Sequence, residues 1–154
     1  MRKLFLVTAG LALLSVLAQF YFAGLGVFRR PEVAEGFTAH AINAGVVQGV
    51  ALLDAVAAGL ARAGRRTVVL AALPALLVFV QYALFAFGGL ATPEGTPLDA
   101  DGVPLVVQGP PVFIVALHVL NAVLILGITA AVFRRARALA AAPAPVPAPA
   151  PAGT

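Results

Sequence analysis

The sequence predicts an all-α membrane protein folded as a transmembrane four-helix bundle. Of its 154 residues, 62% are hydrophobic and 10% are charged, whereas soluble domains average about 25% charged residues. The mean hydropathy is +1.03. A helix needs about 20 apolar residues to cross a bilayer core, and stretches of about this length run approximately over 4–28, 38–61, 67–91 and 112–133. We therefore expect one membrane domain over residues 1–137.

The basic residues predict the orientation of the helices. They gather before the first span, between the second and third spans, and after the fourth. Cytoplasmic segments carry an excess of Lys and Arg. We therefore expect the protein in a bacterial cytoplasmic membrane, with both termini on the cytoplasmic side. In this position the basic side chains contact lipid headgroups, and no nucleic-acid partner is expected. The residues concerned are Arg2, Lys3, Arg62, Arg65, Arg66, Arg134, Arg135 and Arg137.

Both ends of the chain need separate interpretation. The first apolar run continues to Phe28, well beyond the 7–15 apolar residues of a signal peptide, so we expect it to be retained as a helix. Residues 138–154 are rich in Ala and Pro, which predicts an extended, disordered cytoplasmic tail. The chain contains no Cys, which excludes disulfides and thiol chemistry.

A motif repeat predicts that the bundle consists of two tandem hairpins related by internal duplication. The pattern His-x-x-Asn-Ala-x-x-x-x-Gly begins at His40 and again at His118, and these are the only histidines of the chain. In the preceding spans, Gln19-Phe20 followed by Gly26 matches Gln81-Tyr82 followed by Gly88 in the same register. Each half is therefore a Gln-aromatic helix followed by a His-x-x-Asn helix.

The two histidines are the candidate ligands of a b-type haem. Both His-bearing helices run from outside to inside, so both imidazoles are expected near the outer face of the membrane. Imidazole is the usual axial ligand of haem iron, and helix bundles build such sites from facing helices. Under this hypothesis His40 and His118 bind the iron. The acceptors for the ring N–H groups are then Asn43 and Asn121 or a backbone carbonyl. Arg29 and Arg30 are candidate partners of the propionates, or they anchor the helix end by snorkelling.

Two alternatives stay open. In one, the His, Asn and Gln side chains form an interhelical hydrogen-bond network in a structural or accessory subunit that binds another membrane protein. The Gly45-x-x-x-Gly49 pattern suits close helix contact in such a protein, and Gly49 and Gly127 are expected at helix contacts. In the other, the protein is a small transporter. Asp54 is then a proton-relay acid, whereas otherwise it snorkels or pairs with the nearby arginines.

The arrangement of these residues resembles a family of small four-span membrane proteins of unknown function from actinobacteria. The resemblance covers residues ~1–137 and is carried by Gln19-Phe20, Gly26, His40, Asn43, Gln81, His118 and Asn121. The layout is also similar to half of a haem A synthase-type bundle or a membrane b-type cytochrome. This second resemblance implies haem ligation by His40 and His118 and electron transfer with a redox partner. No catalytic residues match, so we do not expect an enzyme.

Overall fold

The computed structural model describes residues 1–29, 34–87 and 111–143 and is all-helical over these ranges. Four long helices, α1 (Arg2–Phe28), α2 (Thr38–Leu60), α3 (Arg65–Phe87) and α4 (Pro111–Ala141), are joined by connections that include a short 3-10 helix, η1 (Ala34–Phe37). Each of the four is long and apolar enough to cross a membrane. The predicted fold class is therefore confirmed.

The helix ends differ slightly from the predicted spans. The difference is largest in α4, which ends at Ala141 rather than at Phe133. Residues 134–141 read Arg-Arg-Ala-Arg-Ala-Leu-Ala-Ala, and Ala, Arg and Leu have the highest intrinsic helix propensities. The helix therefore continues beyond its apolar segment, and residues 138–141, which were expected in the tail, belong to it. Residues 88–91 of the expected third span and 144–154 of the tail lie outside the described ranges.

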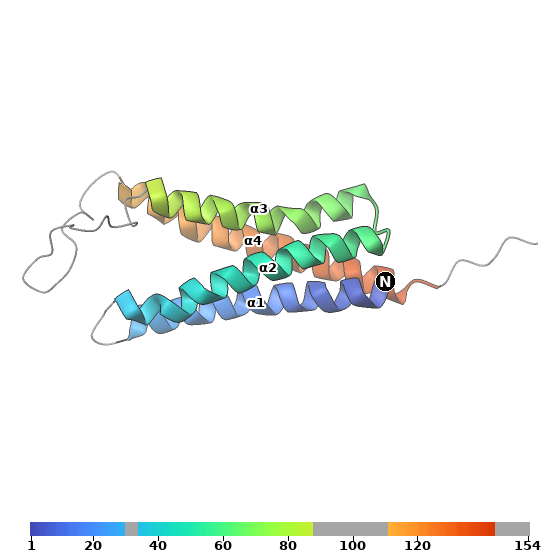
Figure 1. The fold of residues 1–154 in the computed structure, drawn as a ribbon, viewed down its shortest axis with the longest axis horizontal. Helices are drawn as coiled ribbons and strands as arrows, with labels where there is room; N and C mark the ends of the chain where they lie inside the picture. The colour runs from blue at the N-terminus through green and yellow to red at the C-terminus, as the bar shows by residue number, and fades with distance from the viewer. Residues whose placement is uncertain (30–33, 88–110, 144–154) are drawn as a thin grey trace, which may run out of the picture.

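The helices form two antiparallel hairpins, α1–α2 and α3–α4, that lie against each other in one bundle (Figure 1). The hairpins lie close together at the end that carries the N-terminus and separate toward the opposite end (Figure 1). At the close end Arg2 Nη1 donates to the carbonyl of Ala142 at 3.0 Å. The first and last described helices thus begin and end on the same side, as the charge distribution predicts.

The α2–α3 turn is a helix C-cap followed at once by a new helix start. The N–H of Ala63 donates to Ala58 O at 3.1 Å and that of Arg62 to Gly59 O at 2.9 Å, the paired bonds of a Schellman motif. This motif requires a left-handed residue, and Arg62 takes that position with φ of 53°. Gly64 follows with φ of 85°, and its carbonyl accepts the first N–H groups of α3.

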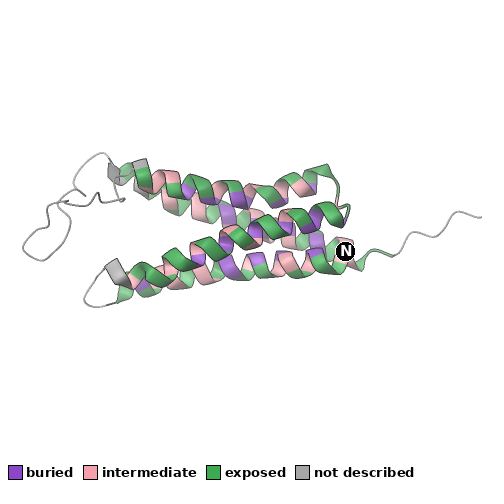
Figure 2. Cartoon of the chain, in the orientation of Figure 1, coloured by how far each residue is buried: buried purple, intermediate pink, exposed green. Residues whose placement is uncertain are grey.

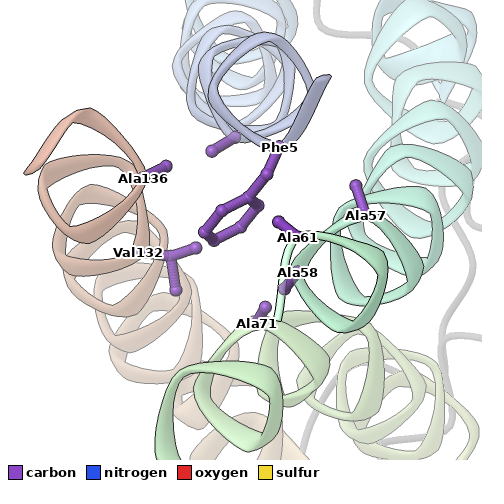
Figure 3. Close-up of a cluster of buried hydrophobic side chains, with 8 residues drawn as sticks. Phe5, Ala57, Ala58, Ala61, Ala71, Val132 and Ala136 are labelled. Carbon is purple, nitrogen blue, oxygen red and sulfur yellow. The ribbon is translucent and has the colours of Figure 1, made fainter. Parts of the chain in front are cut away.

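An apolar cluster holds the close end of the bundle together. The Phe5 ring of α1 points into the centre of the bundle between small side chains of the other three helices (Figure 3). Because most of these neighbours are alanines, the helix backbones approach closely, which is how membrane helices pack in the absence of a hydrophobic driving force. The cluster consists of Phe5, Ala9, Ala57, Ala58, Ala61, Ala71, Val132 and Ala136.

A second apolar cluster lies farther along the bundle axis and takes one side chain from each helix. Val16, Val47, Val78 and Ile125 are each 4% exposed and pack together; we call them the valine layer. Large apolar side chains such as Leu14, Leu53 and Leu120 face outward, so the helix surfaces are largely exposed while buried positions follow the inner faces (Figure 2). Large apolar side chains on the outer surface are expected of a bundle that is surrounded by lipid.

Candidate functional site

The repeated glutamines connect the two helices of each hairpin in the same way. Gln19 Nε2 on α1 donates to the carbonyl of His40 on α2 at 3.0 Å. Gln81 Nε2 on α3 donates to the carbonyl of His118 on α4 at 3.1 Å. The sequence repeat is therefore also a repeat of structure, because equivalent side chains reach the equivalent backbone atoms.

The repeated asparagines make the reciprocal contact, from the His-bearing helix back to its neighbour. Asn43 Nδ2 donates to Ser15 O at 2.9 Å, and Asn121 Nδ2 donates to Leu77 O at 2.8 Å. Ser15 and Leu77 each precede the glutamine of their helix by one turn. A carbonyl inside a helix already accepts a backbone bond but has a second lone pair, so these contacts need no particular side chain at the accepting position.

The two histidines face each other across the boundary between the hairpins. Their ring centroids are 6.0 Å apart and their planes are inclined by 65°. Both residues are half-buried. The structure thus brings together the two residues that the sequence singles out as metal ligands.

His40 is held by hydrogen bonds on both ring nitrogens. Its Nδ1 lies 3.1 Å from Gln19 O, and its Nε2 lies 3.1 Å from Gln19 Nε2. A carbonyl only accepts and an amide nitrogen only donates. His40 is therefore assigned as the neutral tautomer that carries its proton on Nδ1 and accepts at Nε2.

The same glutamine completes a closed network in the first hairpin. The side-chain oxygen of Gln19, Oε1, accepts from Asn43 Nδ2 at 2.6 Å. The side-chain nitrogen, Nε2, donates to the ring and to the carbonyl of His40. Every polar atom of the Gln19 side chain therefore has a partner. We call Gln19, His40 and Asn43 the closed triad.

The second hairpin lacks these additional bonds. Gln81 Oε1 and His118 Nδ1 are buried and have no hydrogen-bond partner among the residues that the structure describes. The described aromatic neighbour of His118 on its own hairpin is Phe85, whose ring centroid lies 4.7 Å away. His118 is therefore packed in place but is not oriented by a hydrogen bond at Nδ1.

The other predicted site residues lie away from the histidine pair or outside the described ranges. Asn43 and Asn121 bind backbone carbonyls, and Asn43 also binds Gln19, so their described bonds do not go to the imidazoles. Arg29 is exposed and caps the end of α1, beside a surface groove that includes Phe28 and Thr38. Arg30 lies outside the described residues.

Asp54 faces the interior of the bundle rather than its surface. Its side chain is 3% exposed, and Thr8 Oγ1 on α1 donates to Asp54 Oδ1 at 2.8 Å. Arg62, Arg65 and Arg66 are exposed, so the expectation of a snorkelling or arginine-paired acid is wrong for the described contacts. Sequence reasoning missed Thr8 as its partner, although the Thr at that position is one of few polar residues in the first span.

Gly45, Gly49 and Gly127 were expected to lie at close contacts between helices, and within this bundle that expectation is wrong. A Cβ added at Gly45, Gly49 or Gly127 would have no atom within 4 Å, so none of them mediates a close contact between helices of this bundle. The close contact is at Gly26 instead, where an added Cβ would lie 2.6 Å from the Phe37 ring. Helical geometry explains why Gly49 and Gly127 make no such contact. Each lies nine residues after its histidine and therefore about half a turn away from the helix face that carries the histidine.

Comparison with known proteins gives one match. Residues 19–88 match a family described as "Family of unknown function (DUF6220)". The matched part of this chain is similar to that family. It begins at Gln19, includes the closed triad and Gln81, and ends before His118, so it covers less than half of the chain and one member of the histidine pair. No curated protein matches the chain, and no solved structure does. The chain is thus a four-helix membrane protein with a partial match to a family of unknown function.

Proposed function

We propose that the protein binds a b-type haem through His40 and His118 and uses it for electron transfer in a bacterial cytoplasmic membrane, with both termini in the cytoplasm. The observation that carries the proposal is the meeting of these two imidazoles, from different hairpins, at 6.0 Å between ring centroids. Two imidazoles that would hold one metal ion, each with its nitrogen about 2.0–2.1 Å from it as for zinc, have to lie within a few ångströms of each other. The separation of the pair therefore fits a shared metal.

The hydrogen bonds of His40 also fit a ligand role. A metal-binding His usually donates its second ring N–H to a carbonyl or carboxylate, and His40 Nδ1 donates to Gln19 O. This leaves Nε2 as the nitrogen with the lone pair. His40 would hold the iron through Nε2, which in this structure contacts Gln19 Nε2, and the Gln19 bond to the His40 carbonyl would not involve the ring.

His118 would be the second ligand. Its Nδ1 has no partner among the described residues, so reorientation of the ring breaks no hydrogen bond there. A haem held in this way supplies a one-electron couple. The residues of this chain contribute its ligands, an apolar surrounding and the orientation of His40.

The first test is the visible absorption spectrum of the purified protein, oxidised and then reduced by dithionite, after expression with haem precursor. We expect a Soret band that sharpens and shifts on reduction, and its loss in His40→Ala and in His118→Ala. Added imidazole should restore part of the spectrum in His118→Gly, because the ligand pocket remains. Gln48→Leu is the matched control, since it removes a polar side chain of α2 without described partners. A folded, colourless wild-type protein would end the proposal.

A second candidate function is that of an accessory subunit that binds another membrane helix. The observation that favours it is the open α2 surface at Gly45 and Gly49, where a Cβ would meet no atom within 4 Å. Small residues four positions apart allow the backbones of two membrane helices to approach closely. The free surface therefore suits a helix that is not part of this bundle.

Blue-native electrophoresis of membranes from the native host tests this candidate. Gly45→Leu should shift the protein from a larger complex to its own size, whereas Gly59→Leu, equally open and on the same helix, should not. His40→Gln should leave the complex intact under this interpretation. The reverse ranking, with loss of the complex in His40→Gln alone, would contradict it.

A further inference from the structure

A surface groove lies on the first hairpin, at the end of the bundle opposite the N-terminus. Its volume is about 860 Å³, and it is bordered by the last turns of α1, by η1 and by the start of α2. Gly24 lines it, and a Cβ added at this glycine would meet no atom within 4 Å. Pockets that bind small molecules have volumes of about 300–1,000 Å³, so the groove is large enough for part of a lipid.

The lining of the groove changes from apolar to charged along the helix axis. Phe20, Leu25 and Ile42 line its apolar part, whereas Arg29 and Thr38 line it where α1 ends and α2 begins. Nine residues separate Phe20 from Arg29, which places Arg29 about 13 Å farther along the axis. Because α1 and α2 are long and apolar enough to cross a membrane, the apolar part is at the depth of the acyl chains and Arg29 is near the headgroups.

Arg29 is placed at the end of the groove by its contact with η1. A Cβ added at Gly36 would lie 3.6 Å from Arg29 Cδ, so the stem of the arginine lies beside this glycine. The residue is exposed. A guanidinium binds phosphate oxygens with two parallel N–H groups. The end of the groove therefore suits a phosphate, and the rest suits a hydrocarbon chain.

The groove faces away from the histidine pair. Thr38 and Ile42 each lie two residues from His40 on α2, which turns them by about 200° around the helix axis. His40 faces His118, so the side of α2 that lines the groove is the opposite one. The groove is thus separate from the proposed haem site, and its occupant does not require haem.

We propose that the groove binds one acidic phospholipid of the surrounding leaflet, with its phosphate on Arg29 and an acyl chain against Phe20, Leu25 and Ile42. The order of the lining matches the order of the lipid, because the cation lies at the level of the phosphate and the apolar side chains at the level of the chain. A second membrane helix would fill the apolar part but would leave the charge of Arg29 unmatched. An acidic lipid is favoured over a zwitterionic one, whose ammonium group offsets the attraction of the phosphate.

Native mass spectrometry of the protein in mild detergent tests the site, with phosphatidylglycerol and phosphatidylethanolamine of identical acyl chains at equal concentration. We expect one retained phosphatidylglycerol per chain and weaker retention of phosphatidylethanolamine. In Arg29→Gln the affinity for phosphatidylglycerol should fall about fivefold, which is the effect of one basic side chain at a membrane surface. Arg66→Gln is the matched control, because it removes an exposed charge at the other end of the bundle.

A second variant tests the apolar part of the groove without removing a charge. Gly24→Leu places a side chain in the open space and should abolish retention of either lipid without lowering the melting temperature. Gly59→Leu, which is equally open and lies outside the groove, should retain phosphatidylglycerol as the wild type does. Equal retention of the two lipids by the wild type would overturn the proposal. So would an unchanged affinity in Arg29→Gln, or an equal loss in Arg66→Gln.

Discussion

The two hairpins share one scaffold but differ in how completely their polar side chains are bonded. In both, a glutamine binds the carbonyl of the histidine, and an asparagine binds a carbonyl of the neighbouring helix. In the first hairpin the side chains also bind one another as the closed triad. In the second, Gln81 Oε1 and His118 Nδ1 are buried without described partners.

This difference separates two tasks that the repeated motif performs. The bonds to backbone carbonyls fix the register of each helix pair, and both halves keep them. The bonds between side chains fix the ring of the histidine, and one half has them. His40 is therefore held at both ring nitrogens, whereas His118 Nδ1 has no partner among the described residues.

Replacing the central glutamine of the closed triad should have the largest effect on stability. Gln19→Leu removes the side-chain partner of His40 Nε2, of the His40 carbonyl and of Asn43 Nδ2, whereas the backbone carbonyl that accepts from His40 Nδ1 remains. Interhelical hydrogen bonds in membranes average about 0.6 kcal/mol with a maximum near 1.7, so the loss of three side-chain bonds should cost about 2 kcal/mol. Steric trapping or reversible unfolding in mixed detergent micelles measures this free energy.

The matched change in the second hairpin sharpens the comparison. Gln81→Leu removes one bond, to the His118 carbonyl, and also removes an oxygen without a described partner. We therefore expect a cost of about 0.6 kcal/mol or less. Equal costs for Gln19→Leu and Gln81→Leu would show that the two hairpins are equally bonded in the membrane and would break the comparison.

The two histidines should differ in the same sense. His40→Phe loses the two ring contacts to Gln19 and should cost about 1 kcal/mol, whereas His118→Phe keeps an aromatic ring beside Phe85 and should be nearly neutral. The ¹⁵N spectrum of the histidine rings provides an independent check in the unliganded protein. His40 should give the signals of a single tautomer with the proton on Nδ1, and His118 those of averaged tautomers. Averaging at both rings would contradict the assignment of His40.

The sequence predicts the architecture well because its causes are local. Apolar length defines the four spans, basic residues mark one end of the bundle, and the repeated Gln and His-x-x-Asn patterns define the hairpins. The pairing of His40 with His118 also follows from the repeat, because equivalent positions on helices that run in the same direction lie at similar depth.

The sequence does not predict which bonds the polar side chains make. Asn43 and Asn121 are assigned from helical spacing to the imidazoles, but an amide on α2 or α4 reaches a backbone carbonyl of the neighbouring helix first, and every helix presents such carbonyls. The position of Asp54 is likewise missed, since the choice between surface and interior depends on a rotation of α2 that spacing from the nearby arginines does not reveal. The open glycines show that a small-residue pattern indicates where a helix permits contact without indicating which partner makes it.

The smallest expected effect concerns a polar side chain outside both networks. Both amide atoms of Gln48 are buried without a hydrogen-bond partner among the described residues. Removing an unpaired buried polar group removes its desolvation cost, and an apolar group of similar shape is often neutral or stabilising at such a position. Gln48→Leu should therefore leave the free energy of unfolding unchanged or raise it by a few tenths of a kcal/mol, measured beside Gln19→Leu. A clear loss of stability would contradict this expectation and mean that the buried Gln48 amide has a partner inside the bundle.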